Sequence, residues 1–238
     1  MRKISTLIIL LTSSFLIGCT TENEPTIKSE TNNPIPFVNI KYLALGDSYT
    51  IGQSVCETCR FPAQLKDSIK KNLTVGTDLS LKIIARTGWT TTNLIAAINE
   101  ENLTEDYDLV TLLIGVNNQY QGKSFSTYEK EFPELVNKSI ALAKGKKTNV
   151  IVVSIPDYAF TPYGHGSPSI SNELYKYNTF AQNYCQENNI EFVYITDITR
   201  EGLSNPKLVA SDGLHPSELA YTKFVERILP KAKVALSD

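Results

Sequence analysis

The sequence predicts an α/β protein built on a five-stranded parallel sheet with helices on both faces. Two observations lead to this prediction. Apolar runs of strand length alternate five times with longer amphipathic segments, which is typical of parallel strands joined by helices. The first run, 40–45, is apolar except for Lys41, as expected of a central strand buried on both faces. No internal repeat or second domain is evident.

The individual elements follow from periodicity and from turn residues. Pro62 suits the first turn of a helix. The segment 126–144 carries apolar residues at three- and four-residue spacing, the pattern of an amphipathic helix, and Gly145 can end it. The predicted strands are 40–45, 79–85, 108–114, 149–155 and 190–195, and the predicted helices are 61–72, 92–102, 126–144, 171–188 and 217–229.

Composition bounds the domain count and the partners. The chain has 238 residues, 42% of them hydrophobic, which is enough for one sizeable core. The formal net charge is −2 and no run of Lys and Arg occurs, so nucleic acid is not an expected partner.

The N-terminus has the pattern of a secretory signal. Arg2 and Lys3 precede an apolar segment, 7–17, that is too short to span a membrane as a mature helix. The segment ends in Leu-Ile-Gly-Cys19, which resembles the cleavage box of bacterial lipoproteins. The resemblance implies cleavage before Cys19 and a diacylglyceryl group on its sulfur, with acyl chains such as palmitate. An ordinary signal peptide with an incidental cysteine is the alternative.

Three segments are therefore expected: a lipoprotein signal peptide over 1–18, a flexible tether over 19–36, and a folded domain over 37–238. The tether is polar and contains three prolines in the stretch 20–36, so it cannot bury enough surface to fold. A lipid anchor of two or more acyl chains would hold the protein stably on a membrane of the bacterial cell envelope.

Ser48 is a candidate nucleophile. It follows the first predicted strand, which ends at Gly46, so its hydroxyl should lie at the carboxyl edge of the sheet, where open α/β sheets bind ligands. A serine held at the end of a rigid strand suits nucleophilic chemistry. The alternative is that Gly-Asp-Ser is an ordinary turn.

Asp212 and His215 are candidates for the remaining acid–base groups. They stand three residues apart just before the last predicted helix. At that spacing the carboxylate can accept from one imidazole nitrogen and leave the other facing a hydroxyl. The other histidine, His165, has no carboxylate in its own turn. The alternative is that His215 only caps the last predicted helix.

Gly88 and Asn117 are candidate oxyanion donors. They follow the second and third predicted strands and so lie at the same sheet edge as Ser48. A glycine can direct its amide into a site, and a carboxamide is a neutral donor, as acyl transfer requires. The alternatives are a plain turn glycine and an Asx-type turn cap.

Cys56 and Cys59 form a Cys-x-x-Cys pair soon after Ser48. A local disulfide is the favoured interpretation in an exported protein. Two free thiols and a redox-active pair remain as alternatives. A zinc site is disfavoured because no second Cys or His pair completes the ligand set.

Gly46-Asp47-Ser48, Gly88, Asn117 and Asp212-x-x-His215, in this order, resemble the four sequence blocks of the SGNH (GDSL-type) esterase and lipase family. The resemblance covers about 38–229. It implies that Ser48 is the nucleophile and first oxyanion donor, that Gly88 and Asn117 complete the oxyanion hole, and that Asp212 orients the base His215. It also implies a flavodoxin-like three-layer α/β/α fold with strand order 2-1-3-4-5.

Two positions depart from the family pattern: Tyr49 follows the serine where the family has Leu, and Asn118 stands where Asp is common. Neither removes a catalytic group.

The expected activity is hydrolysis of carboxylic esters through an acyl-serine intermediate, without a metal or cofactor, by a monomer. Small acyl esters, lysophospholipids and O-acetylated glycans are the three alternative substrate classes. The loop 156–168 carries Tyr158, Phe160 and Tyr163 and is a candidate wall for the acyl group, or else packs only on itself. Acyl or acetyl transfer on the same fold and an inactive, envelope-anchored binding module are the alternatives.

Overall fold

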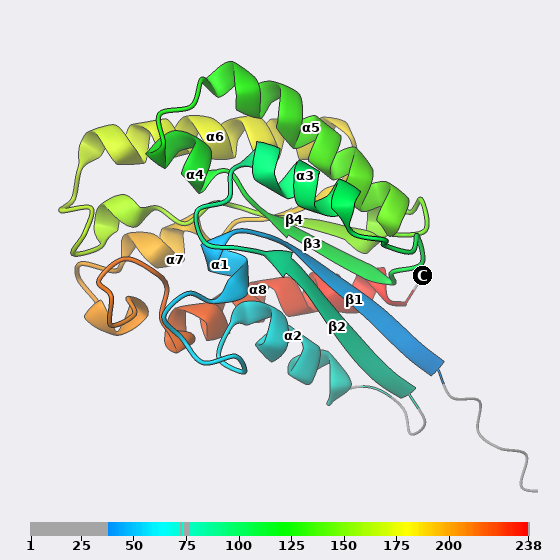
Figure 1. The fold of residues 1–238 in the computed structure, drawn as a ribbon. Helices are drawn as coiled ribbons and strands as arrows, with labels where there is room; N and C mark the ends of the chain where they lie inside the picture. The colour runs from blue at the N-terminus through cyan, green and yellow to red at the C-terminus, as the bar shows by residue number, and fades with distance from the viewer. Residues whose placement is uncertain (1–37, 72, 74–76, 238) are drawn as a thin grey trace, which may run out of the picture. The chain divides into compact units, whose positions relative to one another are not determined.

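Figure 1 shows the protein as a computed structural model. The structure describes residues 38–71, 73 and 77–237. The predicted signal peptide, the lipidation site Cys19 and the predicted tether lie outside the described residues. Within the described part of the chain, no helix combines the length and the apolar character needed to cross a membrane.

The described strands form one parallel sheet in the order β2-β1-β3-β4-β5. This order confirms the predicted five-stranded fold. Every residue of the central strand β3 is buried, as is every residue of β4, because helices cover both faces of the sheet. The strands are β1 (Val38–Gly46), β2 (Thr77–Ala85), β3 (Leu109–Leu113), β4 (Val150–Val153) and β5 (Glu191–Val193).

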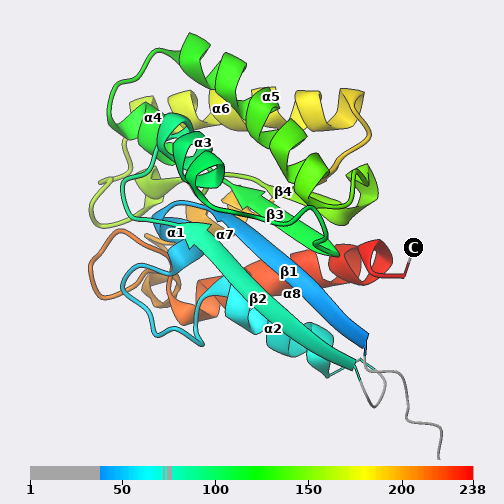
Figure 2. The ribbon, with the colours of Figure 1, turned by 45° about the vertical axis from the view of Figure 1, so that its right-hand side comes forward.

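Longer helices form the two outer layers. Figures 1 and 2 show α2 and α8 on one face of the sheet and α3, α5 and α6 on the other. The three-layer α/β/α arrangement is thus confirmed. The bounds are α2 (Phe61–Lys70), α3 (Thr91–Glu100), α5 (Phe125–Leu142), α6 (Pro168–Glu187) and α8 (Glu218–Ala235).

Three short helices lie where the sequence predicted a turn, a strand end and a loop. They are α1 (Ser48–Ile51), α4 (Val116–Tyr120) and α7 (Thr196–Arg200). Segments of four or five residues are too short to show a helical period.

The last helix also differs from the sequence prediction. It continues through Pro230 to Ala235 instead of ending at 229. Ala232 and Ala235 stay buried against the core beyond the proline, and this packing outweighs the lost backbone hydrogen bond.

The register of β1, β2 and β3 aligns the carboxyl ends of these three neighbouring strands. Gly46 at the end of β1 pairs with Ala85 of β2 and with Leu113 of β3. Ser48 in α1, which follows β1, and Asn117 in α4, which follows β3, therefore lie at the same edge of the sheet. This alignment of strand ends is what gathers residues that lie far apart in the sequence.

Candidate active site

A cavity of about 180 Å³ lies at the carboxyl edge of the sheet. The structure brings four of the predicted site residues together in its lining, Ser48, Gly88, Asn117 and His215, and Asp212 lies behind His215. The full lining is Ser48, Tyr49, Thr87, Gly88, Val116, Asn117, Tyr120, Tyr158, Leu214 and His215.

Ser48 is the first residue of α1 and is buried. The turn that carries it needs glycine at position 46, because a Cβ there would lie 2.1 Å from Oγ1 of Thr50 and 2.4 Å from the carbonyl oxygen of Leu113. As the first helical residue, Ser48 has a backbone N–H that the helix itself does not use. Its amide can therefore serve as an oxyanion donor.

Asp47 caps α1 by accepting a hydrogen bond of 3.0 Å from the backbone N–H of Tyr49. The carboxyl is fully buried, and burial raises its pKa to about 7. Its second oxygen, Oδ2, has no hydrogen-bond partner among the described residues. Asp47 therefore supports the turn at Ser48.

His215 and Asp212 lie in one tight turn before α8. Nδ1 of His215 is 2.6 Å from Oδ2 of Asp212, and Oδ1 of Asp212 accepts from the backbone N–H groups of Leu214 at 2.9 Å and His215 at 3.0 Å. The ring of His215 also packs edge-on against Tyr49, with 5.7 Å between ring centres. The imidazole is thus oriented with Nδ1 on the carboxylate, which leaves Nε2 for a hydroxyl.

The carboxylate of Asp212 also accepts a hydrogen bond of 2.6 Å from Oγ of Ser54. Burial by itself raises the pKa of Asp212, but the hydrogen bonds from Ser54, His215 and Leu214 outweigh it and hold the pKa well below its ordinary value. Asp212 is therefore ionised at neutral pH. Sequence reasoning missed Ser54, because nothing in a loop 158 positions away points to Asp212.

Gly88 lies in the turn after β2 with φ of 83°. This left-handed backbone favours glycine although a Cβ would meet no atom within 4 Å. The side chain of Gln121 holds the turn by donating to the Gly88 carbonyl at 2.8 Å.

Asn117 lies in α4 and is buried. Its Nδ2 donates to the carbonyl of Trp89 at 3.0 Å, which fixes the amide group. An amide NH₂ carries two donors, so a second N–H remains for the cavity. The neighbouring Asn118, one of the two departures from the family pattern, exchanges hydrogen bonds with Thr91 at 3.0 and 2.6 Å and ties α4 to α3.

The loop 156–168 contributes to the aromatic side of the cavity. Tyr158 lines the cavity and donates to Gln119 at 2.8 Å, and burial raises the pKa of Tyr158 to about 12. Tyr163 reaches the site through a hydroxyl–hydroxyl hydrogen bond of 2.7 Å with Tyr120. Phe160 is not part of the lining.

The second histidine lies away from the site. His165 is exposed in the loop 156–168 and does not line the cavity. Among the described residues, no group of three or more His, Cys, Asp or Glu side chains is arranged to hold a metal ion.

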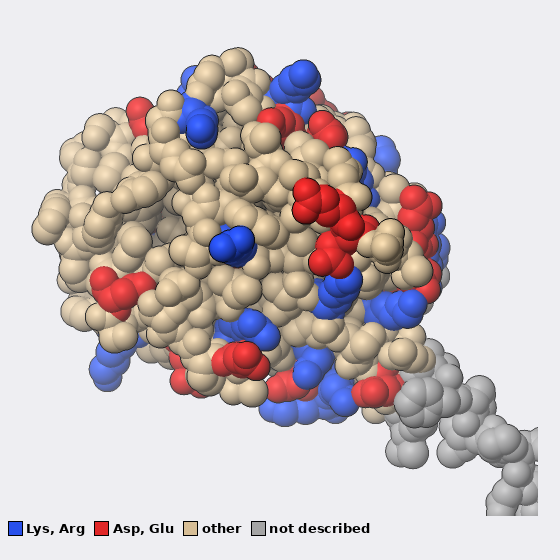
Figure 3. Space-filling model, in the orientation of Figure 1, with Lys and Arg blue, Asp and Glu red and all other residues tan. Residues whose placement is uncertain are grey.

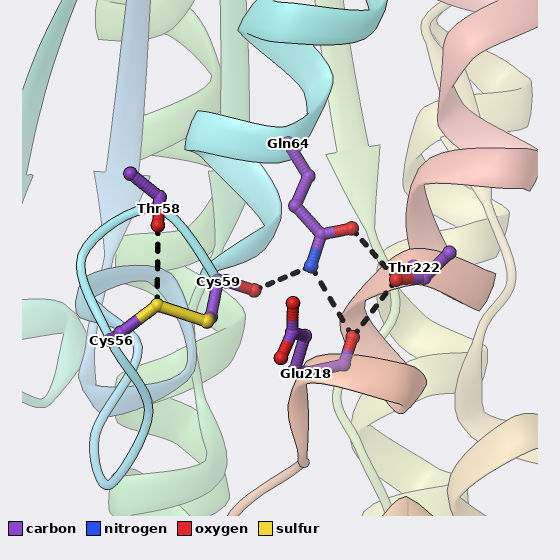
Figure 4. Close-up of a disulfide and its surroundings, with 6 residues drawn as sticks. All are labelled: Cys56, Thr58, Cys59, Gln64, Glu218 and Thr222. Atoms are coloured by element: carbon purple, nitrogen blue, oxygen red, sulfur yellow. Dashed lines mark hydrogen bonds between the residues drawn. A yellow bond between two sulfur atoms is a disulfide. The ribbon is translucent and has the colours of Figure 1, made fainter.

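Cys56 and Cys59 are joined by a disulfide in the loop between α1 and α2. Figure 4 shows this disulfide beside Gln64 of α2 and the first turn of α8. The disulfide lies outside the cavity lining.

The family model described as the GDSL-like lipase/acylhydrolase family matches residues 44–223. No curated protein matches the chain by sequence.

Solved structures share the fold at low sequence identity. A lipase from a goat rumen metagenome is 18% identical, with 81% of this chain and 97% of that chain covered and a TM-score of 0.66. A variant of an acetyl xylan esterase from Geobacillus stearothermophilus is 20% identical over 82% and 96%, with a TM-score of 0.64. An esterase from Pseudoalteromonas sp., inhibited by monoethylphosphonate, is 18% identical over 83% and 99%, with a TM-score of 0.58.

Proposed function

Because the chain belongs to the GDSL-like lipase/acylhydrolase family, and is thus a serine hydrolase of ester bonds, we propose that it removes short acyl groups from uncharged esters. O-acetylated glycans and small acetyl esters are the substrate class that we favour. The observation that carries the proposal is the small, uncharged cavity in which Ser48, Gly88, Asn117 and His215 meet.

The size of the cavity supports a short acyl group. Its volume is about 180 Å³. Pockets that enclose drug-sized ligands measure roughly 300–1,000 Å³. An acetyl or butyryl group fits this space, whereas the fatty acyl chain of a lysophospholipid exceeds it.

The charge of the cavity supports a neutral substrate. None of the lining residues is Lys, Arg, Asp or Glu, and Val116, Tyr120, Tyr158 and Leu214 supply apolar surface. In Figure 3, charged side chains gather mainly over the lower and right-hand parts of the face, and fewer lie on the left. A substrate with a phosphate or carboxylate at the acyl group would find no cationic partner in this lining.

In the proposed reaction, Nε2 of His215 takes the proton of the Ser48 hydroxyl as its oxygen attacks the ester carbonyl. Asp212 holds the ring and stabilises the imidazolium that forms. The amides of Ser48 and Gly88 and the side chain of Asn117 stabilise the negative oxygen of the tetrahedral intermediate. His215 then protonates the leaving alcohol, and the acyl group stays on Ser48.

Water completes the cycle by the same steps in reverse. His215 takes a proton from the water as it attacks the acyl-serine, the second oxyanion occupies the same donors, and the proton returns to Ser48. The carboxylic acid then leaves.

A panel of p-nitrophenyl esters of increasing acyl length, with acetyl-xylan and lysophosphatidylcholine beside it, tests the substrate proposal. We expect kcat/KM to be highest for acetyl to butyryl esters and to fall steeply for longer chains. Highest activity on lysophosphatidylcholine or on the longest esters would refute it. A Ser48→Ala variant serves as the blank for uncatalysed hydrolysis.

Two further assays distinguish hydrolysis from its alternatives. An acyltransferase would form acylated glycerol or sugar when these alcohols are added to the ester assay. An inactive binding module would fail to react with a fluorophosphonate probe at Ser48.

We further propose that the protein is lipid-anchored in the bacterial cell envelope through Cys19. The support is the sequence pattern around that residue. Expression of the full chain with Cys19→Ser should move the protein from the membrane fraction to the soluble fraction and abolish labelling by radioactive palmitate.

A further inference from the structure

Among the described residues, the carboxylate of Asp212 has one hydrogen-bond donor that does not come from its own turn. Oδ1 accepts from two backbone N–H groups of the turn, and Oδ2 accepts from Nδ1 of His215. The fourth donor is Oγ of Ser54, 2.6 Å from Oδ2. Ser54 comes from the loop that follows α1, at a sequence separation of 158.

This fourth hydrogen bond restricts a motion that the other three allow. A carboxylate held by backbone amides at Oδ1 can still pivot about that oxygen. The side chain of Asp212 is 29% exposed, so water can compete for Oδ2. A hydroxyl donor from outside the turn keeps Oδ2 in line with the imidazole.

The backbone of Ser54 also points to a role beyond packing. Its φ is 67°, in the left-handed region that glycine and asparagine adopt more readily than serine. Non-glycine residues held in this region concentrate at functional sites. Serine here supplies a hydroxyl that glycine lacks.

Short backbone turns connect Ser54 to the candidate nucleophile. The N–H groups of Gly52 and Gln53 both donate to the carbonyl of Ser48, at 3.1 and 3.0 Å, and Val55 donates to the carbonyl of Gly52 at 3.2 Å. The position of Ser54 therefore depends on the helix that carries Ser48.

The far end of the loop is held as well. The Cys56–Cys59 disulfide closes it, and Gln64 of α2 donates to the carbonyls of Cys59 at 2.6 Å and Glu218 at 3.3 Å. Figure 4 shows these contacts together with the hydroxyl of Thr222, which donates to Gln64 at 2.8 Å. The loop is thus attached to α2 and to α8, the helix that follows the Asp212–His215 turn.

We propose that Ser54 is a positioning residue for ester hydrolysis: its hydroxyl orients the Asp212 carboxylate, and so His215, relative to the Ser48 helix. This inference rests on the proposed hydrolase function. It assigns to the loop between α1 and α2 the task of linking the nucleophile to its acid–base pair.

Two variants separate the effect of the Ser54 hydroxyl on activity from the effect of the Ser54 backbone conformation. Ser54→Ala removes the hydroxyl and keeps the unfavourable φ, whereas Ser54→Gly removes the hydroxyl and relieves the backbone. We expect both to lower kcat on p-nitrophenyl acetate by roughly 10- to 100-fold with KM unchanged. Ser54→Gly should unfold at the same temperature as the wild type or above it.

Thr58→Ala is the matched control. Thr58 is an exposed hydroxyl residue of the same loop whose side chain contacts the sulfur of Cys56 at 3.2 Å, and its removal should leave kcat unchanged. Full kcat in Ser54→Gly, or a loss confined to KM, would overturn the inference. Recovery of kcat in Ser54→Gly relative to Ser54→Ala would assign the effect to the backbone and overturn it too.

Proton NMR provides a readout that needs no turnover. The chain has two histidines, so a His165→Gln variant assigns the Nδ1–H resonance of His215. We expect this resonance to be sharp and far downfield in the wild type, and broadened or shifted upfield in Ser54→Gly. An unchanged resonance would contradict the inference, whereas failure of the wild type to hydrolyse any ester would contradict the proposed function instead.

Discussion

Nδ1 of His215 lies 2.6 Å from Oδ2 of Asp212, and the two residues are three positions apart in one turn. A hydrogen bond of this length between a ring nitrogen and an ionised carboxylate selects the imidazole tautomer whose Nε2 accepts a proton. In the proposed mechanism, the turn thereby presents His215 as the general base to the cavity that Ser48 lines.

Asp212→Asn should therefore lower kcat by about 10⁴-fold with little change in fold, because the amide favours the wrong imidazole tautomer. Steady-state hydrolysis of p-nitrophenyl acetate measures the loss. Asp67→Asn, a change at an exposed aspartate of α2, is the control and should retain full activity. A loss below tenfold for Asp212→Asn would remove Asp212 from the proposed role.

Asn117→Ala should lower kcat by roughly 10²–10³-fold, because one donor to the oxyanion is lost. Ser48→Ala and His215→Ala should each cost roughly 10⁶-fold. The exposed Asn183 offers a control, and Asn183→Ala should behave as the wild type. Full activity of Asn117→Ala in the same assay would show that its amide does not bind the oxyanion.

Asp47 should make the stability of the fold decrease as pH rises. Burial raises its pKa from 3.8 to about 7, so the folded protein retains this proton between about pH 4 and 7 while the unfolded chain loses it. The free energy of unfolding therefore falls with pH across that window. Asp47→Asn keeps an oxygen for the N–H of Tyr49 and removes the titration.

Thermal unfolding at several pH values between about 4 and 8 tests this prediction. Tm should fall with pH more steeply in the wild type than in Asp47→Asn, and the variant should be the more stable protein at the alkaline end. Parallel Tm profiles would mean that Asp47 is already ionised in the folded state.

Loss of the Cys56–Cys59 disulfide should lower stability by about 2 kcal/mol, as expected for a short closed loop. For a domain of this size that corresponds to a Tm lower by about 4–8 °C. Differential scanning calorimetry with and without a reductant measures the change. The Cys56→Ser/Cys59→Ser variant should have the same lowered Tm with and without reductant, equal to that of the reduced wild type, and an effect of reductant on the variant would point to some other target.

Tyr120→Ala should shift acyl preference toward longer chains. Tyr120 lines the cavity and is joined to Tyr163 through their hydroxyls, so its removal enlarges the acyl space. The ratio of kcat/KM for hexanoyl over acetyl p-nitrophenyl ester should rise about tenfold, a change of ~1.4 kcal/mol in relative transition-state binding. Tyr175→Ala, at an exposed tyrosine outside the cavity lining, should leave the ratio unchanged.

The layers of the fold and the main groups of the candidate site could be predicted from the amino-acid sequence alone. Each depends on a local signal: the alternation of apolar runs, the glycine that ends β1, and the three-residue spacing of Asp212 and His215. Parallel strands joined by helices have their carboxyl ends on one edge, so residues following different strands could be expected to meet there.

The contacts between loop side chains across that edge could not be predicted from the sequence and became visible in the folded chain. The hydrogen bonds of Ser54 to Asp212 and of Tyr120 to Tyr163 join segments 158 and 43 positions apart. The short helices α1, α4 and α7 likewise take their form from their surroundings. Periodicity and turn chemistry act within a few residues, whereas these contacts depend on strand register and loop conformation, which the whole fold sets together.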